Sequence, residues 1–318
     1  MNSTKSSVTM SICMLLLASA VLISCDEIDV TESSYKVANG VDNVAAQRSS
    51  NLPPVTGDPA FTLDPDDPDL EWLPCPEFMP DDCGLAVIQG NPAERNADVY
   101  FKLQPGTSAD HHWHTSDERM VLVSGKMRVD YDGQDPVYLE KGTYAYGPGG
   151  LAHVAHCLEE SEDPCILFIA FEDPVDAIST EEQEAPGSDL EAFIVSAGEV
   201  MFGDCPEFMP AGCGLGVLQG NPEDHDADVL LRLAPDSKIP KHWHTSAERM
   251  VLISGQMRVN YQGQPPVILN PFTYAYGPAK LPHDAICVGP DEECLLFIAF
   301  EEPVDAIDIR GGNLPHRK

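Results

Sequence analysis

Two clusters of histidine and glutamate residues recur along the chain at the same internal spacing. Each cluster holds three histidines and one glutamate: His112, His114, Glu118 and His153 in the first, and His242, His244, Glu248 and His283 in the second, 130 positions later. Imidazole nitrogens and a carboxylate oxygen together bind divalent metal ions, and four such ligands leave room for further ones. The spacing therefore predicts two metal sites.

Strands of a closed sheet would position these ligands. His112 and His114 stand two residues apart, so on a β-strand their side chains project from the same face. Glu118 has the same parity after a Thr-Ser turn, and His153 arrives from a distant segment. His111 has the opposite parity, and His156 is matched by an isoleucine in the second cluster, so we expect neither to bind metal. Arg119 and Arg249, next to the glutamates, are expected to point outward and form structural ion pairs.

The chain is one unit written twice, which sets its domain organisation. The stretch Cys75–Pro80 recurs unchanged 130 residues later as Cys205–Pro210. A repeat with a period of 130 residues corresponds to a whole domain. Short β-branched and aromatic runs, separated by Gly, Pro and Asp, indicate a β-sandwich or jelly roll. We predict two domains, 71–178 and 201–308, joined by a linker over 179–200 and followed by a C-terminal tail over 309–318.

The cysteines of the two repeats suggest disulfides. Four fall in each repeat: Cys75, Cys83, Cys157 and Cys165, then Cys205, Cys213, Cys287 and Cys294. An even set in an exported chain is typical of disulfide bonding, whereas the spacing does not resemble a zinc ribbon. Four cysteines permit three pairings per repeat. We favour the local ones, Cys75–Cys83 and Cys157–Cys165 with their counterparts.

The N-terminus predicts export. An apolar stretch over residues 10–23 ends in Leu-Ile-Ser-Cys, which resembles the lipobox of bacterial lipoproteins. The resemblance implies a signal peptide over 1–25 with acylation of Cys25, and an ordinary secretory signal is the alternative. Residues 26–70, rich in Ser, Asn, Asp and Pro, are expected to form a flexible acidic tether. The protein is thus expected to be a membrane-anchored lipoprotein that faces the periplasm or the cell surface.

Composition limits the partners. The formal net charge of −34 argues against nucleic-acid binding, because a phosphate backbone requires a basic surface. The expected partners are a small-molecule ligand and, through the lipid alone, a membrane. Assembly into a homo-oligomer is left open by the sequence.

The spacing of glycines around the clusters identifies a family resemblance. Gly106-x5-His-x-His-x3-Glu-x6-Gly125, followed by Gly142-x5-Pro-x-Gly150-x2-His, resembles the two signatures of the cupin superfamily over residues 72–178, and again over 202–307. The phrase His-Trp-His-Thr-Ser-x-Glu-Arg-Met is also similar to an uncharacterised bacterial cupin group (DUF4437-like). The resemblance implies an all-β fold of two tandem jelly-roll barrels forming a pseudo-dimer. Three glycine positions depart from the pattern in the second repeat: Asp236, Phe272 and Lys280.

The resemblance also implies cofactors and activities. Cupins hold a divalent ion through the three histidines and the glutamate, so we expect two ions per chain: Fe, Mn or Zn, with Ni and Cu as further candidates. Dioxygenases, oxalate-degrading enzymes and isomerases occur in the superfamily, and we expect a dioxygenase-like oxidoreductase. The alternative is a non-catalytic metal- or ligand-binding lipoprotein. Oxalate-degrading bicupins have an arginine just upstream of the His-Trp-His phrase, where this chain has Ala109 and Ile239, which disfavours an anionic substrate.

Aromatic residues are candidates for the pocket wall. Two tyrosines follow the third glycine position of the motif in each repeat, which is Gly142 in the first and Phe272 in the second: Tyr144 and Tyr146, then Tyr274 and Tyr276. Each pair would either offer phenols to a substrate or pack in a core, and the sequence leaves both readings open. Met120 and Leu122 share the parity of Glu118 and are expected to supply apolar pocket wall.

Overall fold

The computed structural model describes residues 59–309, which all belong to one compact unit, Pro53–Lys318. The predicted signal peptide, the acylation site Cys25 and most of the predicted tether lie outside the described residues. In the described part of the chain, the regular elements are β-strands except for one short 3-10 helix, η1 (Ala197–Glu199). This content confirms the all-β prediction. No helix among the described residues has the length and apolar character needed to cross a membrane.

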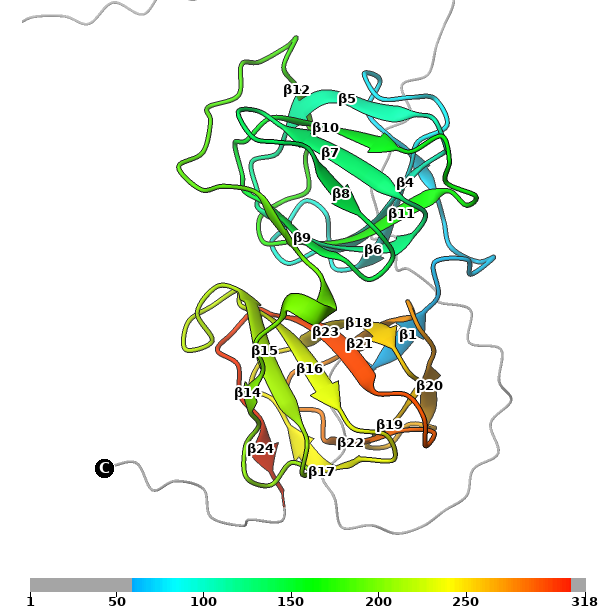
Figure 1. Cartoon of the computed structure of the whole chain (residues 1–318), viewed down its shortest axis with the longest axis vertical. Helices are drawn as coiled ribbons and strands as arrows, with labels where there is room; N and C mark the ends of the chain where they lie inside the picture. Colours follow the sequence, from blue (N-terminus) through cyan, green and yellow to red (C-terminus); the bar gives the residue numbers. More distant parts are fainter. Residues whose placement is uncertain (1–58, 310–318) are drawn as a thin grey trace, which may run out of the picture. The chain divides into compact units, whose positions relative to one another are not determined.

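The first barrel consists of a seven-stranded and a five-stranded antiparallel sheet (Figure 1). In spatial order, the larger sheet contains β13 (Phe193–Val195), β9 (Tyr144–Gly147), β6 (Glu118–Ser124), β11 (Cys165–Phe171), β4 (Asp98–Leu103), β3 (Gly84–Gln89) and β2 (Leu73–Pro74). The smaller sheet contains β12 (Ile178–Ser179), β5 (Ser108–Trp113), β10 (His153–Cys157), β7 (Met127–Tyr131) and β8 (Val137–Leu139). One apolar core cluster includes residues from both sheets.

The second barrel repeats this arrangement strand for strand. Its larger sheet contains β1 (Phe61–Leu63), β21 (Tyr274–Gly277), β18 (Glu248–Ser254), β23 (Cys294–Phe300), β16 (Asp228–Leu233), β15 (Gly214–Gln219) and β14 (Gly203–Asp204). Its smaller sheet contains β20 (Val267–Leu269), β19 (Met257–Tyr261), β22 (His283–Cys287), β17 (Lys238–Trp243) and β24 (Ile307–Asp308). The chain is therefore a pair of tandem barrels, as the repeat predicted.

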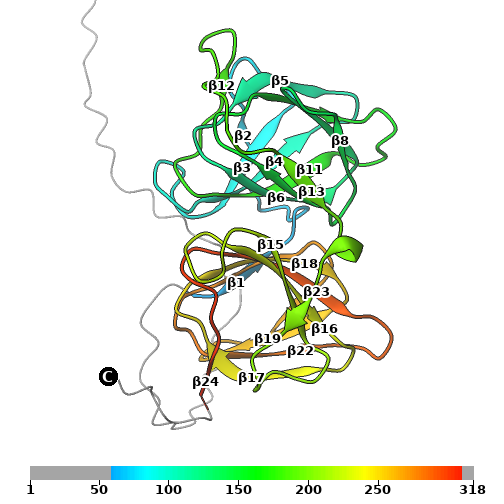
Figure 2. The ribbon, with the colours of Figure 1, turned by 60° about the vertical axis from the view of Figure 1, so that its left-hand side comes forward.

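The two barrels exchange their first strands. β1 precedes the first barrel in sequence but pairs with β21 of the second barrel, Phe61 opposite Tyr276. β13, from the segment between the barrels, pairs with β9 of the first barrel. Both exchanged strands are labelled in Figure 2. Residues 26–70 were predicted to form a flexible tether and residues 179–200 a linker. That prediction was wrong at these two strands, because β1 adds to the larger sheet of the second barrel and β13 adds to the larger sheet of the first.

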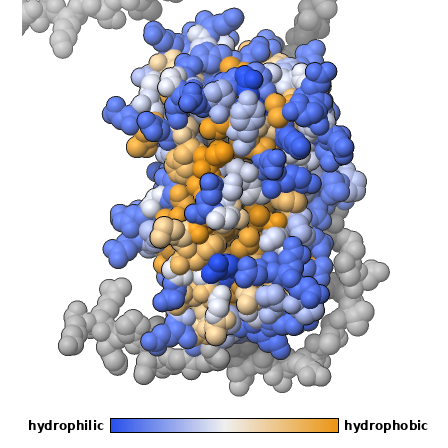
Figure 3. Space-filling model, in the orientation of Figure 1, coloured by the Kyte–Doolittle hydropathy of each residue, from blue (hydrophilic) through white to orange (hydrophobic). Residues whose placement is uncertain are grey.

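The two seven-stranded sheets pack against each other. In β6, Met120 and Leu122 face the core of their own barrel, whereas Val121 belongs to the core cluster between the barrels. In that cluster the ring of Phe168 lies 5.5 Å from the ring of Tyr274, which belongs to the other barrel. Burial on both faces explains why these strands read as continuous apolar runs. Figure 3 shows apolar side chains gathered around the middle of the face in view, where the barrels meet.

Candidate metal centres

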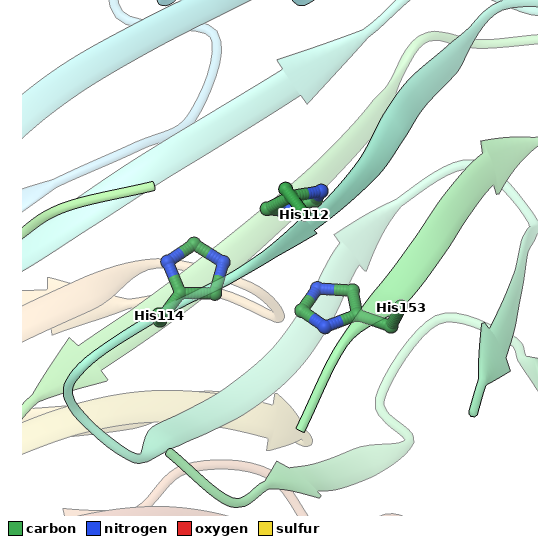
Figure 4. Close-up of side chains that lie close together, drawn as sticks. All are labelled: His112, His114 and His153. Carbon is green, nitrogen blue, oxygen red and sulfur yellow. The ribbon is translucent and has the colours of Figure 1, made fainter. Parts of the chain in front are cut away.

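The predicted ligands of the first cluster converge inside the first barrel. His112, near the end of β5, lies opposite His153 at the start of β10 in the strand register. The coordinating nitrogens of these two residues and of His114 all lie within 4.8 Å of one another, and Figure 4 shows the three imidazoles around one space. Glu118 starts β6, with its Oε1 atom 3.4 Å from Nε2 of His114 and its Oε2 atom 3.6 Å from Nε2 of His153. The barrel thus gathers three imidazoles and one carboxylate.

Backbone carbonyl groups fix the orientation of each imidazole. Nδ1 of His112 is 2.6 Å from the carbonyl oxygen of Asp110, and Nδ1 of His153 is 3.2 Å from that of Leu151. Nδ1 of His114 bonds the carbonyl oxygen of Asp176. A carbonyl oxygen can only accept, so each Nδ1 carries the proton and each Nε2 keeps its lone pair. This arrangement orients histidine ligands in metal proteins.

Burial keeps the imidazoles uncharged. It lowers the pKa of His112 to about 3, with a smaller contribution from His114, and it lowers the pKa of His153 well below its ordinary value. Burial also raises the pKa of Glu118, because the charged carboxylate loses its hydration. Neutral imidazoles are the form that binds metal, and a cation in this space would stabilise the carboxylate.

A divalent metal ion fits this set of ligands. Nε2 of His114 is buried and has no hydrogen-bond partner among the described residues. An unpaired polar atom inside an apolar barrel is unfavourable unless something binds it. Nitrogen and carboxylate donors of this kind suit Mn, Fe, Zn, Ni or Cu. The residues present are therefore suited to hold an ion of this group.

The second barrel reproduces the same centre. Its nitrogens, from His242, His244 and His283, also lie within 4.8 Å of one another. Glu248 approaches His244 to 3.3 Å and His283 to 3.5 Å. The Nδ1 atoms again face backbone carbonyls, at 2.8 Å for His242 and 3.1 Å for His283, and His244 bonds the carbonyl oxygen of Asp305. Two equivalent centres are thus preorganised in one chain.

An apolar cavity opens onto each centre. The cavities measure about 140 Å³ in the first barrel and about 120 Å³ in the second, close to the size that accommodates a benzene-sized molecule. Met120 lines the first, as predicted from its parity with Glu118, together with side chains such as Phe101 and Ile169. The same prediction was wrong for Leu122, which packs in the core of the first barrel and is not among the lining residues. No lysine or arginine is among the described residues that line either cavity. Such a cavity favours a small ligand with little or no negative charge.

The tyrosines singled out in the sequence do not line the cavities. Tyr144 and Tyr274 lie in the core cluster between the barrels, where their hydroxyl groups donate to Asp228 and Asp98, each at 2.6 Å. Tyr146 belongs to the same cluster, and Tyr276 packs against it. The pocket reading of all four was wrong. They share a face of β9 or β21 that the neighbouring barrel covers, so their core reading holds.

Two other tyrosines do line the cavities, one per barrel. Tyr131 ends β7 opposite His153 in the strand register, and its ring centroid is 5.1 Å from that of His153. Tyr261 takes the equivalent place beside His283, at 5.4 Å. The alternation Met127-x-Val129-x-Tyr131 with polar residues between is the sequence signal that would have placed Tyr131 on the inner face.

The other charged candidates serve the scaffold. His111 is exposed and contacts Asp132 at 2.9 Å, and His156 contacts Ser108 at 2.6 Å, so neither joins the metal centre. Arg119 points out of its own barrel, as expected from its parity, but it is fully buried against the other barrel. Its ion pair is structural, and its burial follows from the packing of two sheets that the sequence alone did not reveal.

Four disulfides brace the barrels. They pair Cys75–Cys83, Cys157–Cys165, Cys205–Cys213 and Cys287–Cys294. This connectivity confirms the local pairing. The loop closed by the first disulfide contributes Cys75, Pro76 and Met79 to the cavity wall, and its Phe78 ring lies 6.0 Å from the ring of His112. The repeated Cys-Pro-Glu-Phe-Met-Pro stretch is therefore part of the wall around the metal centre.

Comparisons with known proteins agree with this architecture. A family described as a domain of unknown function (DUF4437) matches residues 68–303. No curated protein matches the chain by sequence. The structure of oxalate decarboxylase from Lactobacillus farciminis in complex with formate is similar with a TM-score of 0.54 at 13% identity, covering 81% of this chain and 90% of that one. Oxalate decarboxylase from Bacillus subtilis, studied for its Mn(II) centres, gives a TM-score of 0.51 at 18% identity, covering 80% of each chain. At these identities the likeness shows the bicupin fold alone.

Proposed function

The chain belongs to the DUF4437 family within the cupin superfamily, and we propose that each of its barrels binds one divalent metal ion through three histidines and a glutamate. The observation that supports this proposal most is the shared orientation of the imidazoles. In both barrels every Nδ1 atom faces a backbone carbonyl, so every Nε2 atom is left to bind an ion. Mn, Fe and Zn are the ions that we favour.

We further propose a dioxygenase-like oxidoreductase acting on a small oxygen-containing substrate. A redox-active ion held by such ligands supplies electron transfer or Lewis-acid polarisation. The protein's own residues would bind and orient the substrate: the apolar walls exclude water, and the three histidines and the glutamate of each barrel line the cavity in which it would lie. Besides the glutamates, the carboxylates among the described lining residues belong to Asp176 and Asp305, and each already accepts two hydrogen bonds, from Thr115 or Thr245. This agrees with chemistry centred on the ion.

Oxalate is a poor candidate for the substrate. The similar solved structures are oxalate decarboxylases, but a dianion in an apolar cavity requires a cationic partner. The position upstream of the His-Trp-His phrase carries Ala109 in one barrel and Ile239 in the other, and Ile239 lines its cavity. A neutral or singly charged oxygen donor suits these cavities better.

Metal analysis tests the central claim. The mature chain, purified from a periplasm without added metal, should contain close to two ions, and His114→Ala/His244→Ala should lose them. His111→Ala is the matched control, because His111 is exposed next to the first ligand and contacts Asp132 instead. An ion content of the parent chain no higher than that of the double variant would refute the proposal.

Turnover separates an enzyme from a binding protein. With iron bound, oxygen consumption in the presence of small enediols, catechols or β-diketones should depend on His114 and His244. The second candidate function is capture of a metal or small ligand without turnover. It would be favoured by zinc at full stoichiometry together with ligand binding and no oxygen consumption.

The proposed location is a membrane surface outside the cytoplasm. The sequence supports a lipid on Cys25, which would tether the barrels through residues 26–58. In cells that process lipoproteins, the parent chain should sediment with membranes, and Cys25→Ser should release it in soluble form. Equal membrane association of both would contradict the lipid anchor.

A further inference from the structure

Tyr131 is placed to contact whatever occupies the first cavity. Its side chain is only 4% exposed, it lines the cavity, and its ring packs against the ring of His153. A methyl group added to Gly147 would lie 3.0 Å from the hydroxyl oxygen of Tyr131 and 3.1 Å from Oε2 of Glu118. The hydroxyl group of Tyr131 and the carboxylate of Glu118 therefore lie beside the same residue, Gly147, which has no side chain to occupy the space next to them.

The hydroxyl group of Tyr131 is buried without a hydrogen-bond partner among the described residues. A buried hydroxyl without a partner is unfavourable, so native proteins rarely keep one without a reason. Its partner must then come from the contents of the cavity. A phenol carries its proton at neutral pH, so the hydroxyl group of Tyr131 can act as a donor.

The second barrel repeats the placement of this phenol beside the cavity and the glutamate. Tyr261 lines the second cavity, and a methyl group on Gly277 would lie 3.3 Å from its hydroxyl oxygen and 3.0 Å from Oε2 of Glu248. The structural tyrosines of the chain behave differently. Tyr144 and Tyr274 are equally buried, but each donates a 2.6 Å hydrogen bond to an aspartate.

We propose that Tyr131 and Tyr261 are ligand-binding residues whose phenols donate a hydrogen bond to an oxygen atom of the small molecule in the cavity. The ligand class that fits is a neutral or singly charged oxygen donor that offers a second oxygen as acceptor beside the glutamate, such as a hydroxamate, an enediol or a β-diketone. This inference rests on the proposed metal-dependent function, because the metal ion would hold the other end of such a ligand.

Acetohydroxamate is a suitable probe, since it is small and presents two adjacent oxygen atoms. Its affinity for the metal-loaded full chain is measured by calorimetry for the parent, for Tyr131→Phe/Tyr261→Phe and for Tyr144→Phe/Tyr274→Phe. We expect the first variant to bind the probe about tenfold more weakly, the effect of one lost hydrogen bond to a charged or strongly polar acceptor. The control pair should bind it as the parent does.

Two further readouts exclude a structural role. Without probe, Tyr131→Phe/Tyr261→Phe should melt no lower than the parent, because the lost hydroxyl of Tyr131 has no partner among the described residues. The control pair should melt several degrees lower, because it loses two hydrogen bonds and leaves buried aspartates short of a donor. The metal content of all three proteins should be the same.

The outcomes distinguish this inference from the proposed function. Unchanged probe affinity in Tyr131→Phe/Tyr261→Phe, or a loss of stability like that of the control pair, would overturn the role of the phenols while metal binding stands. Loss of metal from that variant would also overturn it, since the phenol would then support Glu118 and not the ligand. A parent chain that binds metal but not the probe refutes the ligand class, and a parent chain without metal refutes both proposals.

Discussion

Arg119 of the first barrel forms an ion pair with Asp228 of the second, with Nη1 3.3 Å from Oδ1 and both side chains fully buried. The same nitrogen lies 3.4 Å from the carbonyl oxygen of Phe300, which stands opposite Glu248 in the strand register. Arg119 itself follows Glu118 in sequence. The interface therefore ties β6, which starts with Glu118, to β16 and β23 of the other barrel, and β23 pairs with β18, which starts with Glu248.

Removing one partner of this ion pair should strongly destabilise the protein. Asp228→Ala leaves the guanidinium of Arg119 buried without its closest counter-charge and removes the acceptor of Tyr144. We expect a loss of about 3–5 kcal/mol in the free energy of unfolding, measured by urea denaturation. Asp130→Ala, which breaks a partly exposed pair with Arg128, is the control and should cost about 1 kcal/mol or less. Equal losses of unfolding free energy in the two variants would contradict the expectation that the buried ion pair contributes more to stability than the partly exposed one.

The metal centres could be predicted from the sequence because strand geometry alone places His112 and His114 on one face. The assignment of faces failed for Tyr144, since Val121 and Tyr144 are covered by a second barrel and both faces of their strands are apolar. The strand exchange was also missed. Phe61 carries no local signal for pairing with a strand some two hundred residues away, and only the closed sheets reveal it.

The metal-free protein should lose stability as the pH falls from about 6.5 to 4. Burial lowers the pKa of His112 to about 3 and those of His242 and His283 to about 4. In this window the unfolded chain takes up protons on these histidines and the folded chain does not, so protonation favours unfolding. Each such histidine contributes a slope of up to about 1.4 kcal/mol per pH unit.

Burial of the glutamates opposes this trend in part. It raises the pKa of Glu118 and Glu248, so the folded protein binds their protons more readily and gains stability as the pH falls. Urea denaturation of chelator-treated protein at several pH values measures the sum. His112→Asn/His242→Asn should flatten the slope, whereas His225→Asn, at an exposed histidine, should leave it unchanged. A slope that is the same in all three proteins would contradict the expectation.

Lys280 occupies a turn that suits glycine. Its φ of 64° lies in the left-handed region, where a side chain is strained, and the equivalent residue of the first barrel is Gly150 with a φ of 80°. The backbone N–H of each donates a 2.8 Å hydrogen bond to the carbonyl oxygen of a metal-centre histidine, His244 or His114. Lys280→Gly should therefore raise the free energy of unfolding by about 1 kcal/mol, seen as a melting temperature higher by a few degrees.

The reverse exchange is the matched test of that turn. Gly150→Ala should destabilise the protein, because the new Cβ would meet the carbonyl oxygen of Gly187 at 2.7 Å in addition to the strained backbone. Its cost should exceed 1 kcal/mol in the same assay. If Lys280→Gly lowers the melting temperature, the conformational freedom that glycine adds to the unfolded chain outweighs the relief of strain, and the prediction fails.

Met79 should limit the size of the ligand. It is 8% exposed, lines the first cavity and belongs to the disulfide-closed loop over His112. Met79→Ala should cost about 2 kcal/mol in stability and enlarge the cavity, so that benzohydroxamate gains affinity relative to acetohydroxamate. Leu139→Ala removes a side chain of similar volume from the same core cluster but not from the cavity lining, and should destabilise without changing that ratio. An unchanged ratio of the two affinities in Met79→Ala would contradict the prediction. The loop of the parent chain would then already move aside for larger ligands, and Met79 would not limit their size.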